Sequence, residues 1–99
     1  MNRDPEVLAL VKSTLSELVK RAPGRAIEVR IPPYAAIQCG DGPSHTRGTP
    51  PNVIEMDADT WLSLANGTED WNSAMERGVI SASGARADLS EYLPIRIAQ

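Results

Sequence analysis

The sequence predicts an α+β domain in which a mostly antiparallel sheet of about five strands carries its helices on one face. Apolar residues recur with helical spacing from Leu8 to Ala22, which predicts one long amphipathic helix. From Ala26 to Ile31 they alternate with polar residues instead, as in a strand with one buried face. The whole pattern reads α-β-β-β-α-α-β-α and fills a single domain, residues 1–99.

The first predicted helix covers about residues 5–22. Asp4 is a suitable N-cap, and Pro5 suits the first helical position because its φ angle is already helical. Pro23-Gly24 ends the helix.

Three strands are predicted next, at residues 26–31, 34–39 and 52–56. Pro32-Pro33 between the first two removes two ladder donors, so the chain must turn there, lie at a sheet edge, or both. A proline-rich loop from Gly40 to Pro51 leads to the third strand.

Two short helices are predicted after these strands. Asp57 caps the first, over Ala58–Ala65, and Asn66-Gly67 closes it. Thr68 is the expected cap of the second, which ends at Gly78. Helices this short do not persist alone in water, so their apolar residues must dock onto the rest of the domain.

The last part of the chain predicts a strand, a helix and a final strand. Small residues at Val79–Ser83 form the strand and leave room for close packing against a helix. Asp88–Leu93 predicts a short helix ended by Pro94, and the alternation of Ile95 and Ile97 predicts the final strand.

Composition excludes several classes of protein. The net charge is −3 and the pI about 5.0, and no basic stripe is interleaved with aromatic residues, which argues against a nucleic-acid surface. No apolar run is long enough to span a bilayer, and the N-terminus does not resemble a signal peptide. The single cysteine, Cys39, excludes an internal disulfide. We expect a cytoplasmic protein.

The order of the predicted elements and the residues of the second half resemble the sterol carrier protein 2 (SCP2) family, in particular its short bacterial branch. The resemblance covers about residues 26–95. It rests on the strand IEMD (54–57), the helix DTWLSL (59–64) with Gly67, and the segment from Ala74 through Gly78 to VISASG (79–84). The segments HTRGTPPNV (45–53) and SGARADL (83–89) resemble the bacterial branch specifically.

The resemblance implies an SCP2-like fold: a five-stranded sheet whose helices enclose an apolar tunnel for lipids or sterols. A large empty tunnel is costly in so small a domain. A void of ~300 Å³ destabilises by roughly 7 kcal/mol, against a total stability of ~5–15 kcal/mol. We therefore expect a site that is filled, shallow or completed by a second subunit.

The candidate ligand-binding residues fall into two groups. Trp61, Leu62, Leu64, Trp71 and Met75 are candidates for lining an apolar site, although short helices also use such residues simply to dock on a sheet. His45, Arg47 and Arg86 would bind an anionic head group if they converge, because Arg86 precedes the N-terminus of the last predicted helix. The alternative is loop structure, with Arg47 or Arg86 paired to Asp88, Glu55 or Asp57.

No catalytic constellation, metal site or cofactor is predicted. Cys39 and His45 would suit a thiolate–imidazole pair, but Cys39 reads as a buried, inert strand residue. Asp41, Ser44 and His45 lie too close together on one loop to take the geometry of a triad. One His and one Cys fall short of a zinc site.

Three functions remain. The first is a non-catalytic carrier of a small apolar or amphipathic ligand such as a lipid, fatty acid or sterol. The second is an interaction or accessory domain, as a homodimer or with a protein partner, in which Pro32-Pro33 and the acidic second half contribute to the surface. A third follows from a further resemblance to the carrier-like domains of mycothiol-dependent isomerases, whose metal ligands lie on a separate helical domain. Under this third hypothesis the chain is the partner of a separately encoded helical protein and not an enzyme by itself.

Overall fold

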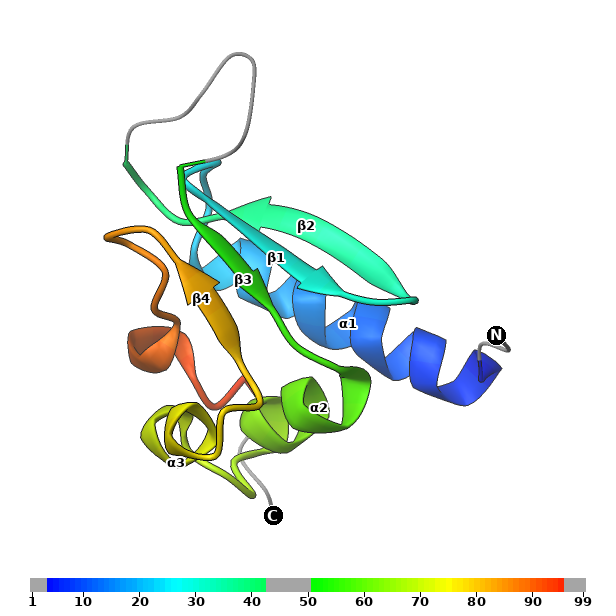
Figure 1. The fold of residues 1–99 in the computed structure, drawn as a ribbon. Coiled ribbons are helices and arrows are strands. Elements are labelled where there is room, and N and C mark those ends of the chain that lie inside the picture. The colour runs from blue at the N-terminus through cyan, green and yellow to red at the C-terminus, as the bar shows by residue number, and fades with distance from the viewer. Residues whose placement is uncertain (1–3, 43–50, 96–99) are drawn as a thin grey trace.

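The computed structural model describes residues 4–42 and 51–95. Its elements follow in the order α1 (Pro5–Arg21), β1 (Ile27–Ile31), β2 (Ala35–Cys39), β3 (Val53–Glu55), α2 (Ala58–Asn66), α3 (Trp71–Glu76), β4 (Ser81–Ser83) and the 3₁₀ turn η1 (Ser90–Tyr92). The predicted α+β class and the predicted order of elements are confirmed (Figure 1). The last helix is shorter than predicted, one 3₁₀ turn rather than a helix over Asp88–Leu93.

The sheet has four strands in the order β2-β1-β3-β4 in the part of the chain that the structure describes. The outer pairs, β1–β2 and β3–β4, are antiparallel, whereas β1 and β3 run parallel. The sheet is therefore mixed and one strand smaller than predicted. At the predicted fifth strand, the amide of Ile95 donates to the carbonyl of Ala65 in α2 instead (2.9 Å). Residues 96–99 lie outside the described part of the chain.

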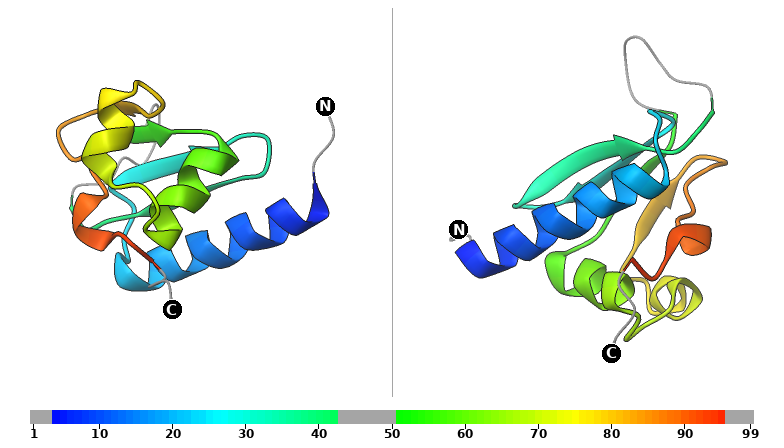
Figure 2. Two further views of the ribbon diagram at one scale, coloured as in Figure 1. Left: turned by 90° about the horizontal axis from the view of Figure 1, so that it is seen from below. Right: turned by 180° about the vertical axis from the view of Figure 1, so that it is seen from behind.

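Helix α1 begins and ends as the sequence predicts. The Oδ1 atom of Asp4 accepts the amide hydrogens of Glu6 and Val7, and the helix extends over 17 residues. Its buried positions recur with the spacing of one helical face: Val11, Thr14, Leu15 and Leu18. This face lies across β1 and β2 (Figure 2).

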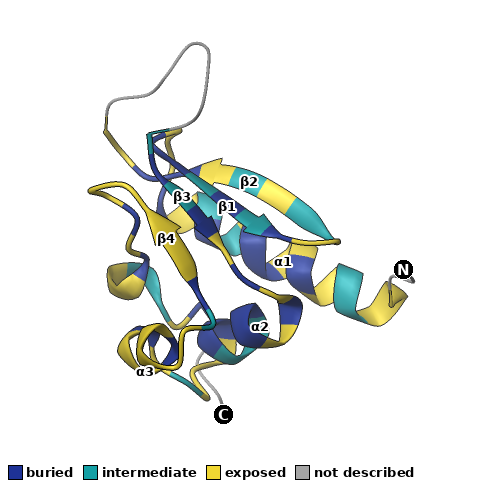
Figure 3. Cartoon of the chain, in the orientation of Figure 1, coloured by how far each residue is buried: buried dark blue, intermediate teal, exposed yellow. Residues whose placement is uncertain are grey.

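The core fills the space between this helix layer and one face of the sheet. Ile27, Val29 and Ile31 of β1 point into it, and Ile54 of β3 lies in register beside Val29. Glu28 and Arg30 alternate with them on the opposite face, which no helix of the described residues covers (Figure 3). The helices thus lie on one face of the sheet, as predicted.

Helices α2 and α3 complete the core at the lower end of the sheet in Figure 1. Asp57 caps α2, and Gly67 ends it at φ +83°, both as predicted. The predicted cap of α3 is wrong, because Asp70 rather than Thr68 accepts the amide hydrogen of Ser73. Thr68 instead bonds back to the carbonyl of Ser63 through both its amide and its hydroxyl.

Strand β4 does not pack as the sequence predicts. All three of its residues are exposed, so their small side chains serve no close contact with a helix. Both alternatives predicted for Pro32-Pro33 are confirmed. The chain turns there, where the amide of Tyr34 donates to the carbonyl of Ile31 (2.8 Å), and the strand that follows, β2, lies at the edge of the sheet.

Candidate functional site

A groove of about 280 Å³ opens between the end of α2, the start of α3 and the segment that follows η1. Its apolar lining comes from Leu64, Trp71, Leu93 and Pro94, which converge from these three elements. Its polar lining comes from Gly67, Glu69, Asp70, Asn72 and Ser90. The arrangement gives an apolar floor with a polar rim, as small-molecule sites commonly have.

Local structure explains why the groove exists. The left-handed residue Gly67 reverses the chain between α2 and α3, and a Cβ atom there would meet Pro94 at 3.4 Å. On the other side, the carbonyl of Ala65 holds the amide of Ile95. The chain after η1 is therefore fixed alongside α2, and Leu93 and Pro94 form one wall.

The segment after η1 is also held by α1. The guanidinium of Arg21 donates to the backbone carbonyls of Tyr92 (3.3 Å), Pro94 (2.8 Å) and Ile95 (2.6 Å). Three bonds from one planar group fix both the position and the orientation of this wall. No sequence pattern indicates this role of Arg21, which has the features of an ordinary basic residue in the last turn of a helix.

The structure brings together only two of the predicted apolar site residues, Leu64 and Trp71, which is 6% exposed. Trp61 is fully buried and lies outside the groove lining, and its indole N–H donates to Thr14 in the core. Met75 is 40% exposed on α3 and does not line the groove. Leu62 is partly buried against the core.

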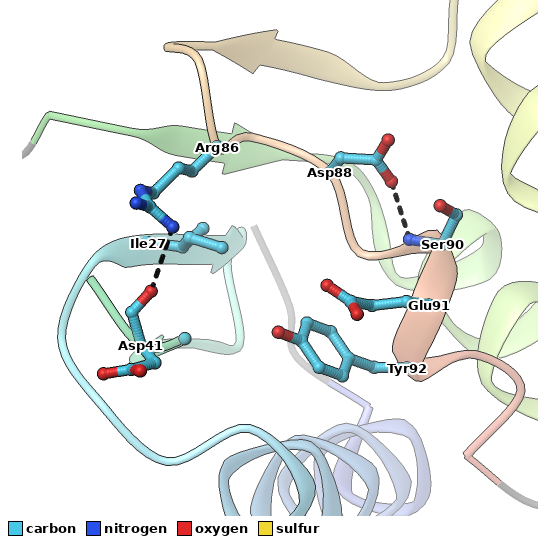
Figure 4. A pocket seen from close by; sticks show the side chains of 8 residues that line it. Ile27, Asp41, Arg86, Asp88, Ser90, Glu91 and Tyr92 are labelled. Carbon is cyan, nitrogen blue, oxygen red and sulfur yellow. Dashed lines mark hydrogen bonds between the residues drawn. The ribbon is translucent and has the colours of Figure 1, made fainter.

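A second pocket, of about 220 Å³, surrounds Arg86 (Figure 4). Ile27 lies in its wall, and the side chains of Glu91 and Tyr92 point into it from η1. Arg86 reaches across the pocket and donates to the carbonyl of Asp41 (3.4 Å). Two more acidic residues, Asp88 and Glu91, also line the pocket, so its lining contains three carboxylates and one guanidinium.

This charge balance bears on the predicted anion site. The surroundings of Arg86 are negative overall, and its guanidinium contacts the backbone of Asp41 instead of standing free. Burial, followed by the nearby carboxylates of Glu91 and Asp41, raises the pKa of Tyr92. The other two predicted members of the site, His45 and Arg47, lie outside the described residues.

Asn52 explains why Arg86 lies at this pocket. Its buried side chain donates through Nδ2 to the carbonyl of Ala26 (2.8 Å) and accepts the amide hydrogen of Arg86 at Oδ1 (2.8 Å). It thereby joins β1, β3 and the turn after β4. Gly84 in that turn lies so close that a Cβ atom would be 2.4 Å from Asn52 Oδ1. The two segments that resemble the bacterial branch, 45–53 and 83–89, therefore meet at their described ends.

Cys39 lies in the core with no exposed surface. Burial raises the pKa of its thiol to about 11, so the thiol is protonated and unreactive at neutral pH, in agreement with the sequence prediction. In residues 4–42 and 51–95, no three His, Cys, Asp or Glu side chains are grouped so that they would hold a metal ion. No helix in these ranges combines the length and apolar character needed to cross a bilayer.

The comparison with known families gives a match over nearly the whole chain. The model of a family described as bacterial SCP ortholog matches residues 3–95. The match thus extends over α1, which lay outside the resemblance seen in the sequence. No curated protein matches the chain.

Proposed function

The chain belongs to the family of bacterial SCP (sterol carrier protein) orthologs, and from this premise we propose that it is a non-catalytic carrier of a small apolar or amphipathic ligand. The observation that carries the proposal is the convergence of Leu64, Trp71, Leu93 and Pro94 on one groove. Leu93 and Pro94 expose apolar surface at this concave site, with Leu64 and Trp71 largely buried beside them, and a ligand gains from the removal of such surface from water.

The size of the groove limits what it holds. Its volume of about 280 Å³ is roughly twice that of a ~150 Å³ cavity that binds one benzene ring. It also lies at the lower end of ~300–1,000 Å³, the usual range of small-molecule sites. We propose that it takes the apolar end of a ligand, such as a short acyl chain or a small ring system, and that the remainder of the ligand stays outside.

The two tryptophans allow a direct test. Trp71 lines the groove and Trp61 does not, so titration with 1-octanol should change the fluorescence of Trp71 alone. The response should disappear in Trp71→Phe and persist in Trp61→Phe. Native mass spectrometry of the purified protein should also detect a bound lipid. The absence of both a fluorescence response and a bound lipid would overturn the proposal.

A matched pair of variants locates the site. Asn72 lines the groove from an exposed position on α3, so Asn72→Phe should fill the groove at little cost in stability. Glu76 is exposed on the same helix but does not line the groove, which makes Glu76→Phe the control. We expect the first variant to lose 1-octanol binding and the second to retain it. Equal binding by both would place the ligand elsewhere.

A further inference from the structure

We propose that the polar end of the ligand is a hydrogen-bond donor, a hydroxyl or an ammonium group, and that the groove discriminates against carboxylates. This inference rests on the proposed function and concerns the rim of the same groove. It follows from two acidic residues there, Glu69 and Asp70, and from the residues that already pair with them.

Glu69 forms an ion pair with Arg77. Its Oε1 accepts from Nη2 of Arg77 and its Oε2 from Nε of Arg77, both at 2.8 Å, and Oε2 also accepts from the hydroxyl of Ser73 at 3.0 Å. The bidentate bond from Arg77 holds the pKa of Glu69 below its usual value, so the carboxyl is ionised at neutral pH. Arg77 is not part of the groove lining, and its Nε and Nη2 are bound to Glu69. The positive charge of Arg77 is thus compensated by Glu69 and lies outside the groove lining.

Asp70 keeps an exposed negative charge at the rim. Its Oδ1 accepts the amide hydrogen of Ser73 as the N-cap of α3, a bond that leaves the charge of the carboxylate in place. Among the described residues it forms no ion pair. The other polar lining residues are Asn72 and Ser90, which are neutral.

The rim therefore offers mainly acceptors. A carboxylate has only acceptor atoms at neutral pH, whereas a hydroxyl or ammonium group can donate to the oxygens of Asp70 and Glu69. Two like charges about 4 Å apart in water also repel by an amount that corresponds to roughly a fivefold change in affinity. Both effects favour donors, and none of the described lining residues is basic.

Three probes with the same chain separate the head groups: 1-octanol, octylammonium and octanoate, titrated at neutral pH and low salt by Trp71 fluorescence or calorimetry. We expect octanoate to bind at least about fivefold more weakly than 1-octanol, and octylammonium at least as tightly. The difference should shrink as salt screens the charges. If octanoate binds as tightly as 1-octanol, the inference fails but the groove stands. If none of the three binds, the groove itself fails.

Asp70→Asn tests the residue directly, because Asn also caps helices while the charge is removed. The affinity for octanoate relative to that for 1-octanol should rise about fivefold in this variant. Asp59→Asn, at an exposed position of α2 outside the groove lining, is the control and should alter none of the three affinities. Arg77→Gln leaves the charge of Glu69 unpaired and should weaken octanoate further. An unchanged affinity for octanoate in both Asp70→Asn and Arg77→Gln would overturn the inference.

Discussion

The indole N–H of Trp61 donates a hydrogen bond of 2.7 Å to the hydroxyl oxygen of Thr14, and both side chains are buried. The hydroxyl of Thr14 in turn donates to the carbonyl of Leu10 at 2.7 Å. This chain of bonds joins α2 to α1 through residues 47 positions apart. The largest side chain of the core is thus fixed in orientation as well as in place.

Thr14→Val is expected to lower the free energy of unfolding by about 1–3 kcal/mol, because it leaves the buried indole N–H of Trp61 without a partner. In a Trp61→Phe background the same change should cost about 1 kcal/mol less, since no N–H remains to be satisfied. Urea unfolding of the four proteins measures this coupling. An equal cost of Thr14→Val in both backgrounds would show that the bond contributes nothing.

Gly84→Ala is expected to destabilise the protein by roughly 3 kcal/mol or more. Gly84 has φ +109°, and a Cβ atom there would lie 2.4 Å from both Asn52 Oδ1 and the carbonyl oxygen of Pro51. Gly78→Ala is the matched control, because Gly78 also has a positive φ but its Cβ would meet nothing within 4 Å. It should cost only about 1 kcal/mol. Thermal unfolding should separate the two, and similar melting temperatures would contradict the proposed crowding at Asn52.

Cys39 should make stability fall at high pH. Its pKa is about 11 in the folded protein and about 9 in the unfolded chain, so the unfolded state releases the proton first. Its contribution is complete below about pH 9 and is lost as the pH rises toward 11, by up to roughly 2–3 kcal/mol. Urea unfolding across this range checks the expectation.

Cys39→Ala supplies the control for the effect of pH. The raised pKa of Tyr92 acts in the same direction as that of Cys39, so some loss of stability at high pH remains in the variant. The slope between pH 9 and 11 should nevertheless become shallower. A slope identical to that of the wild type would show that the thiol does not titrate as described.

Arg21→Met should loosen the wall of the groove without unfolding the domain. It keeps most of the aliphatic stem of the side chain but removes the donors to Tyr92, Pro94 and Ile95. Hydrogen exchange should then accelerate at residues 90–95 while the amides of β1 stay protected. Lys20→Met, which breaks only an exposed pair with Glu17, is the control and should leave exchange at 90–95 unchanged.

The local features of the fold were predictable because they depend on neighbours in the sequence. Asp4 and Asp57 were recognisable as caps, and so was Gly67 as the end of α2. The cap of α3 was ambiguous, because Thr68 and Asp70 are both suitable residues within one turn. In the structure Thr68 bonds to Ser63 at the end of α2 and Asp70 is the cap, and no pattern of single residues reveals this bond.

The pairing of strands that are far apart in the chain could not be predicted from the sequence. The parallel pairing of β1 with β3 requires the chain to leave the edge strand β2 and pass β1 before it forms β3, whereas the strand spacing alone favours a mostly antiparallel sheet. The same limit applies to the site. Trp61 and Trp71 look equivalent in the sequence, but only the structure shows that Thr14 holds one and that Leu93 and Pro94 border the other.

The face of the sheet opposite the helices affects which substitutions this sequence can accept during evolution. Glu28, Arg30 and Glu55 lie on that face, where Glu28 and Arg30 form an ion pair and Glu55 is exposed. Such positions can drift among polar residues with little penalty, while Val29 and Ile54 between them are held to apolar side chains of fixed size. Deep mutational scanning should therefore show that substitutions are tolerated at one position and not at the next along these strands. A sheet covered on both faces would not show this alternation.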